Sequence, residues 1–334
     1  MKPAISVVLS AYNTELFIAE AISSILDQTF TDFEFIIIDD GSTDRTLAVI
    51  NRFEDSRIKV IVNENNLGLA ASLNKGMKEA RGKYIARMDA DDISDLKRFE
   101  IQYDFLEKHP TIDVCVTPMK LFGSEISVSG SGHATDAEIK SELVWGTPTN
   151  HATMLIRTEK VARHSLYYDE SFGVGQDWKY WFDIRDFVNI ARIEAVLYSY
   201  RRGEHNVTVQ FRDKSKDRSL RMHTILLQDM GISFSSDELL MHQFINGLFS
   251  IEPSKKAVKA AHTWYLKLLR NNLICCKYDA IEFERNAKRK WDRLFFLIVP
   301  YGFTCVLGYI IASGISWAQF LYYVKYNIRS IIRY

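Results

Sequence analysis

Three carboxylates stand within four positions of this chain, at Asp89, Asp91 and Asp92, shortly after the apolar, β-prone run 84–86. Like charges a few ångströms apart repel one another, so a strand that ends in adjacent acids calls for a compensating cation. A hard divalent metal bound through oxygen, with a diphosphate as a further ligand, meets that need and indicates chemistry on a nucleotide. The alternative is a solvated acidic turn that caps the next helix, and the run alone leaves both open.

A second chemically informative residue is Asp177, which follows the glycine-containing stretch 173–175 and would stand at the start of a helix. A carboxylate there can act as a general base that takes the proton from an attacking acceptor hydroxyl. The helix dipole also stabilises an acid at a helix N-terminus, so capping is the alternative role.

Two residues near the N-terminus could contact a nucleotide base. Asp40 follows an isoleucine-rich run, and Gly41-Ser42 allow a sharp turn that would leave its carboxylate able to accept a hydrogen bond from a base N–H. Tyr12, at the end of the first apolar run, could stack on the same base. A turn residue and ordinary packing at the rim are the alternative interpretations.

The acceptor and diphosphate side has three weaker candidates. His151 could line the acceptor site, or it could be a satisfied polar residue near the start of a strand. Arg201 and His205 lie together with Arg202 in one short basic stretch, where a cation could neutralise a leaving diphosphate. A basic surface loop is the alternative.

These residues must be positioned by the elements around them. The pattern predicts strands at 4–10, 34–39, 58–62 and 84–88, with helices at 15–28, 44–53 and 69–80 between them. That alternation predicts an α/β fold with a mainly parallel central sheet and helices on both faces. Ligands on such sheets bind beyond the carboxyl ends of the strands, which is where the polar clusters fall.

The pattern after residue 113 and the absence of two nucleotide-binding motifs narrow the class of enzyme. Residues 113–200 are less regular, with a strand at 152–156 and a helix at 177–187, and helices are expected near 213–230, 236–248, 255–275 and 279–292. No Gly-x-Gly-x-x-Gly follows the first strand, and no Gly-x4-Gly-Lys-Ser/Thr is present. These absences weigh against a dinucleotide oxidoreductase and a P-loop NTPase.

The distribution of charge limits the partners that the chain could bind, and the cysteine content limits the cellular compartment. The 334 residues carry 42 basic and 42 acidic side chains, yet residues 285–334 hold eight Lys or Arg and one acid, a net charge of +7. A chain of zero net charge with a basic C-terminal segment indicates that this segment meets a surface, and it does not indicate nucleic-acid binding. The four cysteines show no metal or disulfide spacing, which is typical of a reducing compartment. The chain enters a strand at once, so we expect no signal peptide.

In combination, these motifs resemble glycosyltransferase family 2, the inverting transferases with a GT-A fold. The matching stretches are Ser6–Asn13, Ile38–Asp44, Asn66–Ala70, Asn74–Gly76, Gly82–Asp92, His151–Met154 and Gln176–Trp178. The resemblance covers about residues 4–210, and its first hundred residues are the most specific part. The Gln-x-x-Arg-Trp signature of processive members is absent after Asp177, so we expect transfer of one sugar per encounter.

The resemblance implies roles for individual residues. Asp177 would be the catalytic base; the family often has Glu-Asp here, and Gln176 leaves Asp177 as the single carboxylate of the pair. Asp89 and Asp91 would form the acidic motif, with Asp91 as the direct ligand of Mn or Mg. The contacts expected for the nucleotide sugar are Ser10, Tyr12, Asn13, Asp40, Asn66, Asn74, Asp89 and Arg98. For the loop around Asn66 and the helix with Asn74, a structural role is the alternative.

The pattern of the C-terminal segment predicts association with a membrane. Residues 294–324 carry no charge, basic residues flank them on both sides, and 320–332 show amphipathic helical spacing. The segment could span, re-enter or lie on a membrane, and packing on the catalytic domain or a dimer interface is the alternative. We expect a location at the cytoplasmic face.

The sequence therefore predicts a GT-A catalytic domain at 1–210, with a nucleotide-sugar half at about 1–112 and an acceptor half at about 113–210. A helical extension would follow at 211–292, with a membrane-associating segment at 293–334. The expected function is metal-dependent, inverting transfer of a sugar from a nucleoside-diphosphate sugar, UDP by resemblance, to a glycan or lipid-linked acceptor in surface polysaccharide or glycolipid biosynthesis. A homodimer is possible. A nucleotidyltransferase and a non-catalytic nucleotide-sugar scaffold are the alternatives.

Overall fold

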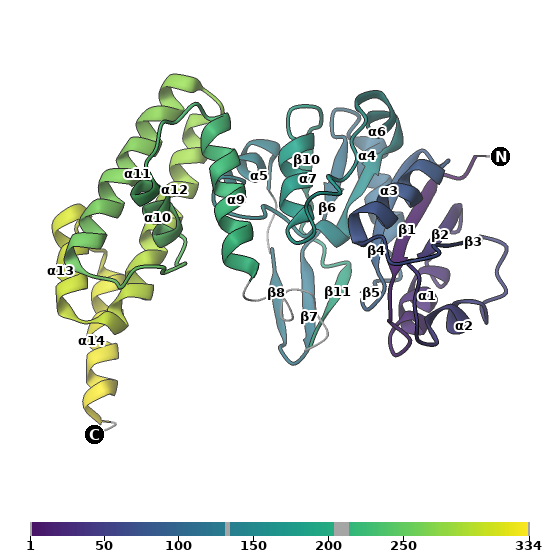
Figure 1. Ribbon diagram of the computed structural model, residues 1–334, viewed down its shortest axis with the longest axis horizontal. Coiled ribbons are helices and arrows are strands. Elements are labelled where there is room, and N and C mark those ends of the chain that lie inside the picture. The colour runs from purple at the N-terminus through teal and green to yellow at the C-terminus, as the bar shows by residue number, and fades with distance from the viewer. Residues whose placement is uncertain (1, 131–133, 204–213, 333–334) are drawn as a thin grey trace. The chain divides into compact units, whose positions relative to one another are not determined.

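The computed structural model describes residues 2–130, 134–203 and 214–332 (Figure 1). The chain divides into two compact units. The first comprises Met1–Ile139 and Thr147–Arg212, and the second comprises Lys140–Gly146 and Asp213–Tyr334. The short segment Lys140–Gly146 thus groups with the second unit although it is surrounded in sequence by the first.

The first unit is built on a seven-stranded sheet with the order β10-β6-β9-β4-β1-β2-β3. Its strands are β1 (Ile5–Ala11), β2 (Phe33–Asp39), β3 (Ile58–Val62), β4 (Tyr84–Asp89), β6 (Val114–Val116), β9 (Leu155–Arg157) and β10 (Ile190–Arg192). Within the described residues, β9 runs antiparallel to its neighbours β4 and β6, and the other pairings are parallel. The predicted mainly parallel sheet is confirmed.

Helices cover both faces of this sheet, also as predicted. On one face, Val7 and Leu9 of β1 belong to the same core as Ile22 of α1 (Ile18–Leu26) and Phe99 of α4 (Arg98–Lys108). On the other face lies α3 (Leu69–Glu79), whose Gly76 comes so close to the sheet that an added Cβ would lie 2.5 Å from Val8 Cγ1. Because both faces are covered, the central strands β1 and β2 are buried along nearly their whole length.

A second, four-stranded sheet has the order β5-β11-β7-β8. Its strands are β5 (Ile93–Ser94), β7 (Met119–Gly123), β8 (Ser127–Ser129) and β11 (Tyr198–Arg202). The remaining helical elements of the first unit are α2 (Thr46–Ile50), η1 (His151–Thr153), α6 (Thr158–His164) and α7 (Gln176–Ile184). Helix α5 (Asp136–Glu142) begins in the first unit and ends in the segment that groups with the second.

The second unit is helical and has its own apolar core. Its elements are α9 (Lys214–Asp229), α10 (Ser236–Ile245), α11 (Lys255–Cys275), α12 (Ala280–Ile298), η2 (Val299–Tyr301), α13 (Phe303–Ser313) and α14 (Trp317–Ile332). Tryptophans and phenylalanines fill the centre, including Trp264 and Phe295. Ser235 caps α10 with a complete capping box, which fixes where that helix begins.

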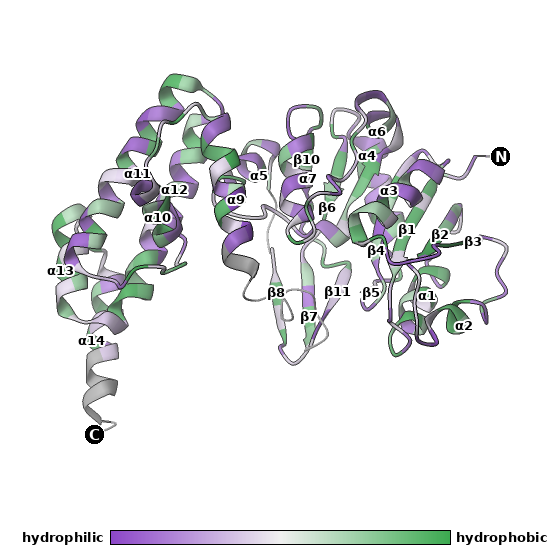
Figure 2. Ribbon diagram, in the orientation of Figure 1, coloured by the Kyte–Doolittle hydropathy of each residue, from purple (hydrophilic) through white to green (hydrophobic). Residues whose placement is uncertain are grey.

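The uncharged C-terminal segment divides between the core and the surface. Leu294, Phe295, Val306 and Tyr309 are buried in the core of the second unit, and α13 is mostly hydrophobic along its length (Figure 2). Among the described residues, the helices fall short of the length and apolar character that crossing a bilayer requires.

Candidate active site

The predicted polar clusters meet at one edge of the seven-stranded sheet. Strand β1 lies between β2 and β4, and the register pairs Ser10 with Asp89 on one side and Ala11 with Asp39 on the other. Tyr12 follows directly and is 43 % exposed, so its ring is accessible to a stacking partner. The carboxyl ends of three adjacent strands therefore bring the first strand end, the Asp39-Asp40 pair and the acidic motif together.

The acidic motif sits in the turn from β4 to β5 and is partly neutralised from within. Asp89 Oδ2 lies 2.6 Å from Nη1 of the buried Arg87. Asp92 is fully buried, and its Oδ1 accepts a hydrogen bond from the backbone N–H of Arg201 at 2.8 Å. Burial, followed by the charge of Asp89, raises the pKa of Asp91 to about 6. The Asp91 carboxyl is thus held where a positive charge would be favourable.

Arg201 is fixed against this motif by the small sheet. The pairing of β11 with β5 brings it there, and its Nε donates to the backbone carbonyl of Asp91 at 2.8 Å. Its guanidinium also pairs with Glu20 and stacks over the ring of Phe17. The structure therefore places the predicted diphosphate-side arginine at the acidic turn, where it already has partners. His205, the other residue predicted for this role, lies outside the described residues.

Asp40, predicted to contact the base, is committed to the protein's own loop. It is 2 % exposed, and its Oδ1 accepts from Asn63 Nδ2 at 2.8 Å and from the backbone N–H of Leu67 at 2.9 Å. Its Oδ2 accepts from the backbone N–H of Gly68 at 2.9 Å. Asp40 thus fastens the loop between β3 and α3 to the end of β2.

Two asparagines predicted as nucleotide contacts also hold the loops together. Asn13, with a φ of 50°, accepts a hydrogen bond from the Thr43 backbone N–H at 2.9 Å. Asn66 Oδ1 accepts from the Gly68 backbone N–H at 2.9 Å, which forms a local turn. The side-chain oxygens of both residues therefore stabilise the loops at the sheet edge.

Asp39 is the residue at this edge that the sequence did not single out. It is 1 % exposed, its Oδ1 is buried and lacks a hydrogen-bond partner among the described residues, and its Oδ2 accepts a long 3.3 Å bond from Ser42. A buried acceptor without a donor is costly, so such an atom is suited to receive a hydrogen bond from a ligand. In sequence, nothing distinguishes it from Asp40.

Asn74 anchors the loop that leads to the proposed base. Its amide makes two bonds with the backbone of Tyr168, accepting from the N–H at 2.7 Å and donating to the carbonyl at 2.9 Å. Asn74 is buried on α3, and its contact with the nucleotide stays a prediction. It fixes Tyr168, eight residues before Gln176 and the start of α7.

Asp177 lies in the first turn of α7, after Gly175 in the left-handed region with a φ of 87°. The hydroxyl of Tyr168, in the loop before this helix, is buried. Burial first, and then the negative charges of Asp89 and Asp177, raise the pKa of Tyr168, while Arg87 opposes them. The Tyr168 hydroxyl therefore stays protonated at neutral pH.

His151 supports this arrangement from inside the protein. It is 7 % exposed, and its Nε2 lies 2.5 Å from the hydroxyl of Tyr168. The rings of Tyr180 and Trp181 meet it edge-on. Burial, with a smaller contribution from Arg87, lowers the pKa of His151 well below its ordinary value, so the imidazole is neutral. His151 is therefore positioned to orient Tyr168, and its place at the acceptor side stays a prediction.

Arg98, predicted to contact the nucleotide, is also internal. It is 0 % exposed, and its Nη2 donates to the backbone carbonyls of Arg87 at 2.9 Å and Ala152 at 3.1 Å. Burial lowers the pKa of Arg98 to about 10. A guanidinium enclosed in this way cannot reach a nucleotide, and it instead ties β4 to the segment before β9.

The residues present fit a divalent cation whose ligands come partly from the protein and partly from a bound substrate. Within the described ranges, no group of three or more His, Cys, Asp or Glu residues is close enough to hold a metal by itself. Mg²⁺ is typically bound through one or two carboxylates together with phosphate oxygens and water. The crowded carboxylates of Asp89 and Asp91 match that donor set.

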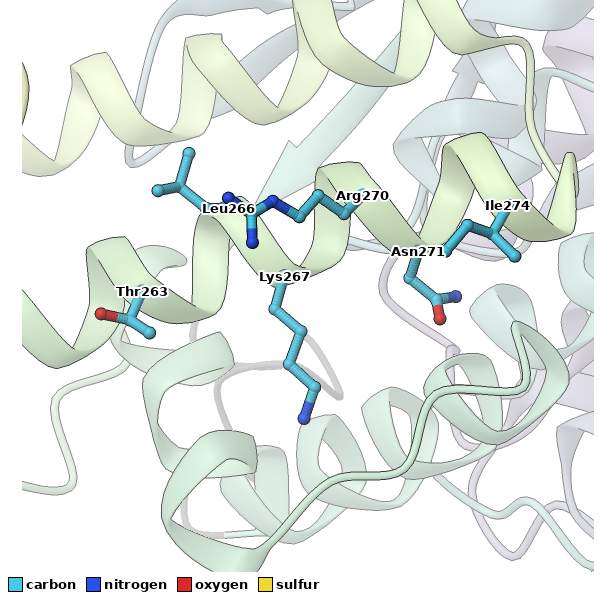
Figure 3. A pocket seen from close by; sticks show the side chains of 6 residues that line it. All are labelled: Thr263, Leu266, Lys267, Arg270, Asn271 and Ile274. Atoms are coloured by element: carbon cyan, nitrogen blue, oxygen red, sulfur yellow. The ribbon is translucent and has the colours of Figure 1, made fainter.

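A concavity in the second unit is a different feature. It has a volume of about 530 Å³ and is lined by six residues of α11, Thr263, Leu266, Lys267, Arg270, Asn271 and Ile274 (Figure 3). Lys267 pairs with Glu238 at 2.7 Å, and Asn271 donates to the Met230 carbonyl at 3.0 Å. None of the predicted site residues lines it.

Comparison with known proteins places the chain among sugar transferases. The family model described as Glycosyl transferase family 2 matches residues 6–170. An uncharacterized glycosyltransferase of Methanocaldococcus jannaschii is 36 % identical over 216 residues, which span 60 % of this chain and 71 % of the relative. One of Haemophilus influenzae is 29 % identical over 274 residues, spanning 77 % and 84 %.

A third relative has a named reaction. The UDP-Glc:alpha-D-GlcNAc-diphosphoundecaprenol beta-1,3-glucosyltransferase WfgD of Escherichia coli is 38 % identical over 105 residues, which span 31 % of this chain and 42 % of the relative.

Solved structures share the fold. Residues 1–349 of S. aureus TarS in complex with UDP align with a TM-score of 0.59 at 18 % identity, covering 86 % of this chain and 90 % of that one. The mannosyltransferase PcManGT from Pyrobaculum calidifontis, in complex with GDP-Man and Mn²⁺, aligns with a TM-score of 0.56 at 15 % identity, covering 93 % and 86 %.

Proposed function

Because this chain belongs to glycosyltransferase family 2 and is a glycosyltransferase, we propose that it transfers one sugar, with inversion, from a nucleoside-diphosphate sugar to a hydroxyl of a glycan or lipid-linked acceptor. The observation that carries the proposal is the meeting of three strand ends at one edge of the sheet, where Ser10 pairs with Asp89, Ala11 pairs with Asp39 and Arg201 donates to the Asp91 carbonyl.

The chemistry follows from these positions. Asp177 takes the proton of the acceptor hydroxyl as that oxygen attacks the anomeric carbon from the face opposite the diphosphate. The new carbon–oxygen bond forms while the bond to the diphosphate breaks, and the diphosphate leaves with the electron pair. One displacement inverts the anomeric configuration, through a transition state with oxocarbenium character.

On the donor side, the protein would hold the nucleotide at the end of the sheet. Tyr12 stacks on the base, the unsatisfied Oδ1 of Asp39 receives a base N–H, and Ser10 lies beside the acidic motif. A divalent cation held by Asp91 and Asp89 would supply the positive charge that offsets the departing diphosphate. Arg87 keeps Asp89 oriented through their ion pair.

The comparisons support a polysaccharide or glycolipid role without fixing the substrates. WfgD is named for a UDP-Glc donor and a diphosphoundecaprenol-linked acceptor, and TarS was solved with UDP, so a UDP-sugar and a lipid-linked acceptor are our first choices. PcManGT binds GDP-Man and Mn²⁺, so guanosine donors belong in the same screen.

The test is a donor screen on the purified full chain. UDP- and GDP-sugars are incubated with Mn²⁺ or Mg²⁺ and a polyprenyl-diphosphate-linked sugar, and release of the nucleoside diphosphate and formation of product are measured. We expect one nucleotide class to turn over, with loss of activity on chelation and in Asp177→Asn. Equal turnover with chelator would contradict the metal proposal, and full activity of Asp177→Asn would contradict the base proposal.

A further inference from the structure

The last helices of the second unit expose an apolar and aromatic surface that the catalytic chemistry does not use. We call its members the terminal patch. They are 39–72 % exposed and comprise Tyr301, Phe303, Ile311, Trp317, Phe320, Leu321 and Tyr322. Large side chains exposed in such number within a short stretch of chain indicate an interaction site.

The patch results from how α13 and α14 pack. On α13, Cys305, Val306 and Tyr309 point into the core, which leaves Phe303 and Ile311, eight positions apart, on the outward face. A helix of 3.6 residues per turn puts such positions on one side. These exposed side chains therefore form an outward stripe on α13.

On α14, Gln319 is buried and Tyr323 packs against the core, so the opposite face carries Trp317, Phe320 and Leu321 at i, i+3 and i+4. The rings of Trp317 and Phe320 stack at 5.3 Å, which fixes an aromatic surface outside the core. Trp317 is 72 % exposed, the largest exposed fraction in the patch.

The distribution of charge specifies the partner. Residues 294–324, which include the whole patch, carry no Asp, Glu, Lys or Arg, while residues 285–334 have a net charge of +7. Exposed Arg293 precedes the uncharged stretch, and exposed Lys325 follows it. A second copy of the chain would bring two such positive flanks together, which repel, whereas an anionic surface attracts both.

We propose that the terminal patch is an interfacial membrane-binding surface, in which the aromatic face of α14 and the outward face of α13 enter the headgroup region of an anionic lipid bilayer. Tryptophan, tyrosine and phenylalanine suit that region because their rings tolerate the boundary between water and hydrocarbon. The basic flanks suit the cytoplasmic leaflet, which carries anionic lipids. The proposal does not depend on the glycosyltransferase reaction.

The test is binding of the purified full chain to vesicles by flotation. The vesicles contain phosphatidylcholine alone or with phosphatidylglycerol, at low and high salt. We expect binding to the anionic vesicles that weakens with salt, because surface attraction is screened. The affinity of the patch variant Trp317→Ser with Phe320→Ser for anionic vesicles should fall by about tenfold or more.

Leu273→Ser with Ile274→Ser is the matched control, since these residues are 66 % and 82 % exposed on α11, outside the patch. It should bind like the wild type. All variants are checked for an unchanged unfolding transition, and both pairs are exposed enough to leave the core intact. Three outcomes would overturn the proposal: no binding of the wild type to anionic vesicles, equal loss in the control, or a wild-type dimer that the patch variant dissolves without any vesicle binding.

Discussion

Replacing Asp40 by asparagine tests whether this carboxylate fastens a loop or holds the base. Its two oxygens accept three hydrogen bonds, from Asn63, Leu67 and Gly68, at 2.8–2.9 Å. An asparagine keeps one oxygen and replaces the other by a donor. The least costly orientation keeps the oxygen toward Asn63 and Leu67 and leaves the Gly68 N–H facing an NH₂ group.

The cost can be estimated from those bonds. A hydrogen bond to a charged group contributes about 1.5–3 kcal/mol, and a neutral acceptor gives roughly half of that. Losing one bond and weakening two, with some relief because a buried charge disappears, lowers the free energy of unfolding by about 2–3 kcal/mol. For a unit of this size, that corresponds to a Tm lower by about 5–10 °C.

The adjacent Asp39 offers a matched control. Asp39→Asn removes a charge whose Oδ1 has no partner and whose Oδ2 has only a 3.3 Å bond, so stability should change by less than about 1 kcal/mol. Binding should show the reverse order. Asp39→Asn is expected to weaken UDP binding about three- to tenfold, because the charged acceptor of the base N–H becomes a neutral amide oxygen. Asp40→Asn should leave the Kd of the folded protein within about threefold.

Thermal and urea unfolding, followed by circular dichroism, and titration calorimetry with UDP measure both quantities on the same samples. If Asp40→Asn unfolded at the wild-type temperature, the three hydrogen bonds would not have the assigned role. If Asp40→Asn lost UDP binding while Asp39→Asn kept it, the original sequence-based assignment would hold and the structural argument would fail.

Three further predictions concern the base, the packing of the sheet and acid stability. Asp177→Asn should lower kcat about 10²–10⁴-fold and leave UDP affinity unchanged by calorimetry, and a near-wild-type rate would exclude Asp177 as the base. Gly76→Ala would place a Cβ 2.5 Å from Val8 Cγ1 and 2.6 Å from Ile38 Cδ1, so the free energy of unfolding should fall by about 1–3 kcal/mol. An unchanged Tm would contradict that close approach. Burial lowers the pKa of His242 in the folded protein to about 4. As the pH falls, the unfolded chain therefore protonates this imidazole before the folded chain does, and the stability present at neutral pH is lost toward pH 4. Urea unfolding near pH 5 should show about 2 kcal/mol less stability from this residue than at neutral pH, and an equal pH dependence in His242→Gln would refute the assignment.

The fold was largely predictable because its signals are local. Apolar runs such as Phe35–Ile38 and the helical periodicity between them define a parallel sheet, and parallel strands bring their carboxyl ends to one edge. The acidic motif and the end of β1 could therefore be placed together without coordinates. The Ser10–Asp89 register confirms that inference.

The partners of individual side chains were not predictable, since they come from distant segments. Arg201 meets Asp92 across 109 positions, and Asn74 meets Tyr168 across 94. These contacts depend on the pairing of β11 with β5 and on the path of the loop before α7, neither of which has a periodic signature. The grouping of Lys140–Gly146 with the second unit has the same cause.

Residue type at a strand end is therefore a weaker guide to ligand contact than hydrogen-bond satisfaction. Leaving a buried polar atom without a partner costs about 1–3 kcal/mol, so a fold that buries such atoms must supply partners from its own chain. Arg98, Asn74 and Asp40 have those partners and are bound by them, whereas Asp39 Oδ1 lacks one. A ligand that supplies the missing donor stabilises the folded state by the amount this atom costs when it stands alone. The stabilisation conferred by UDP should therefore shrink in Asp39→Asn and persist in Asp40→Asn, even though the second variant is the less stable of the two.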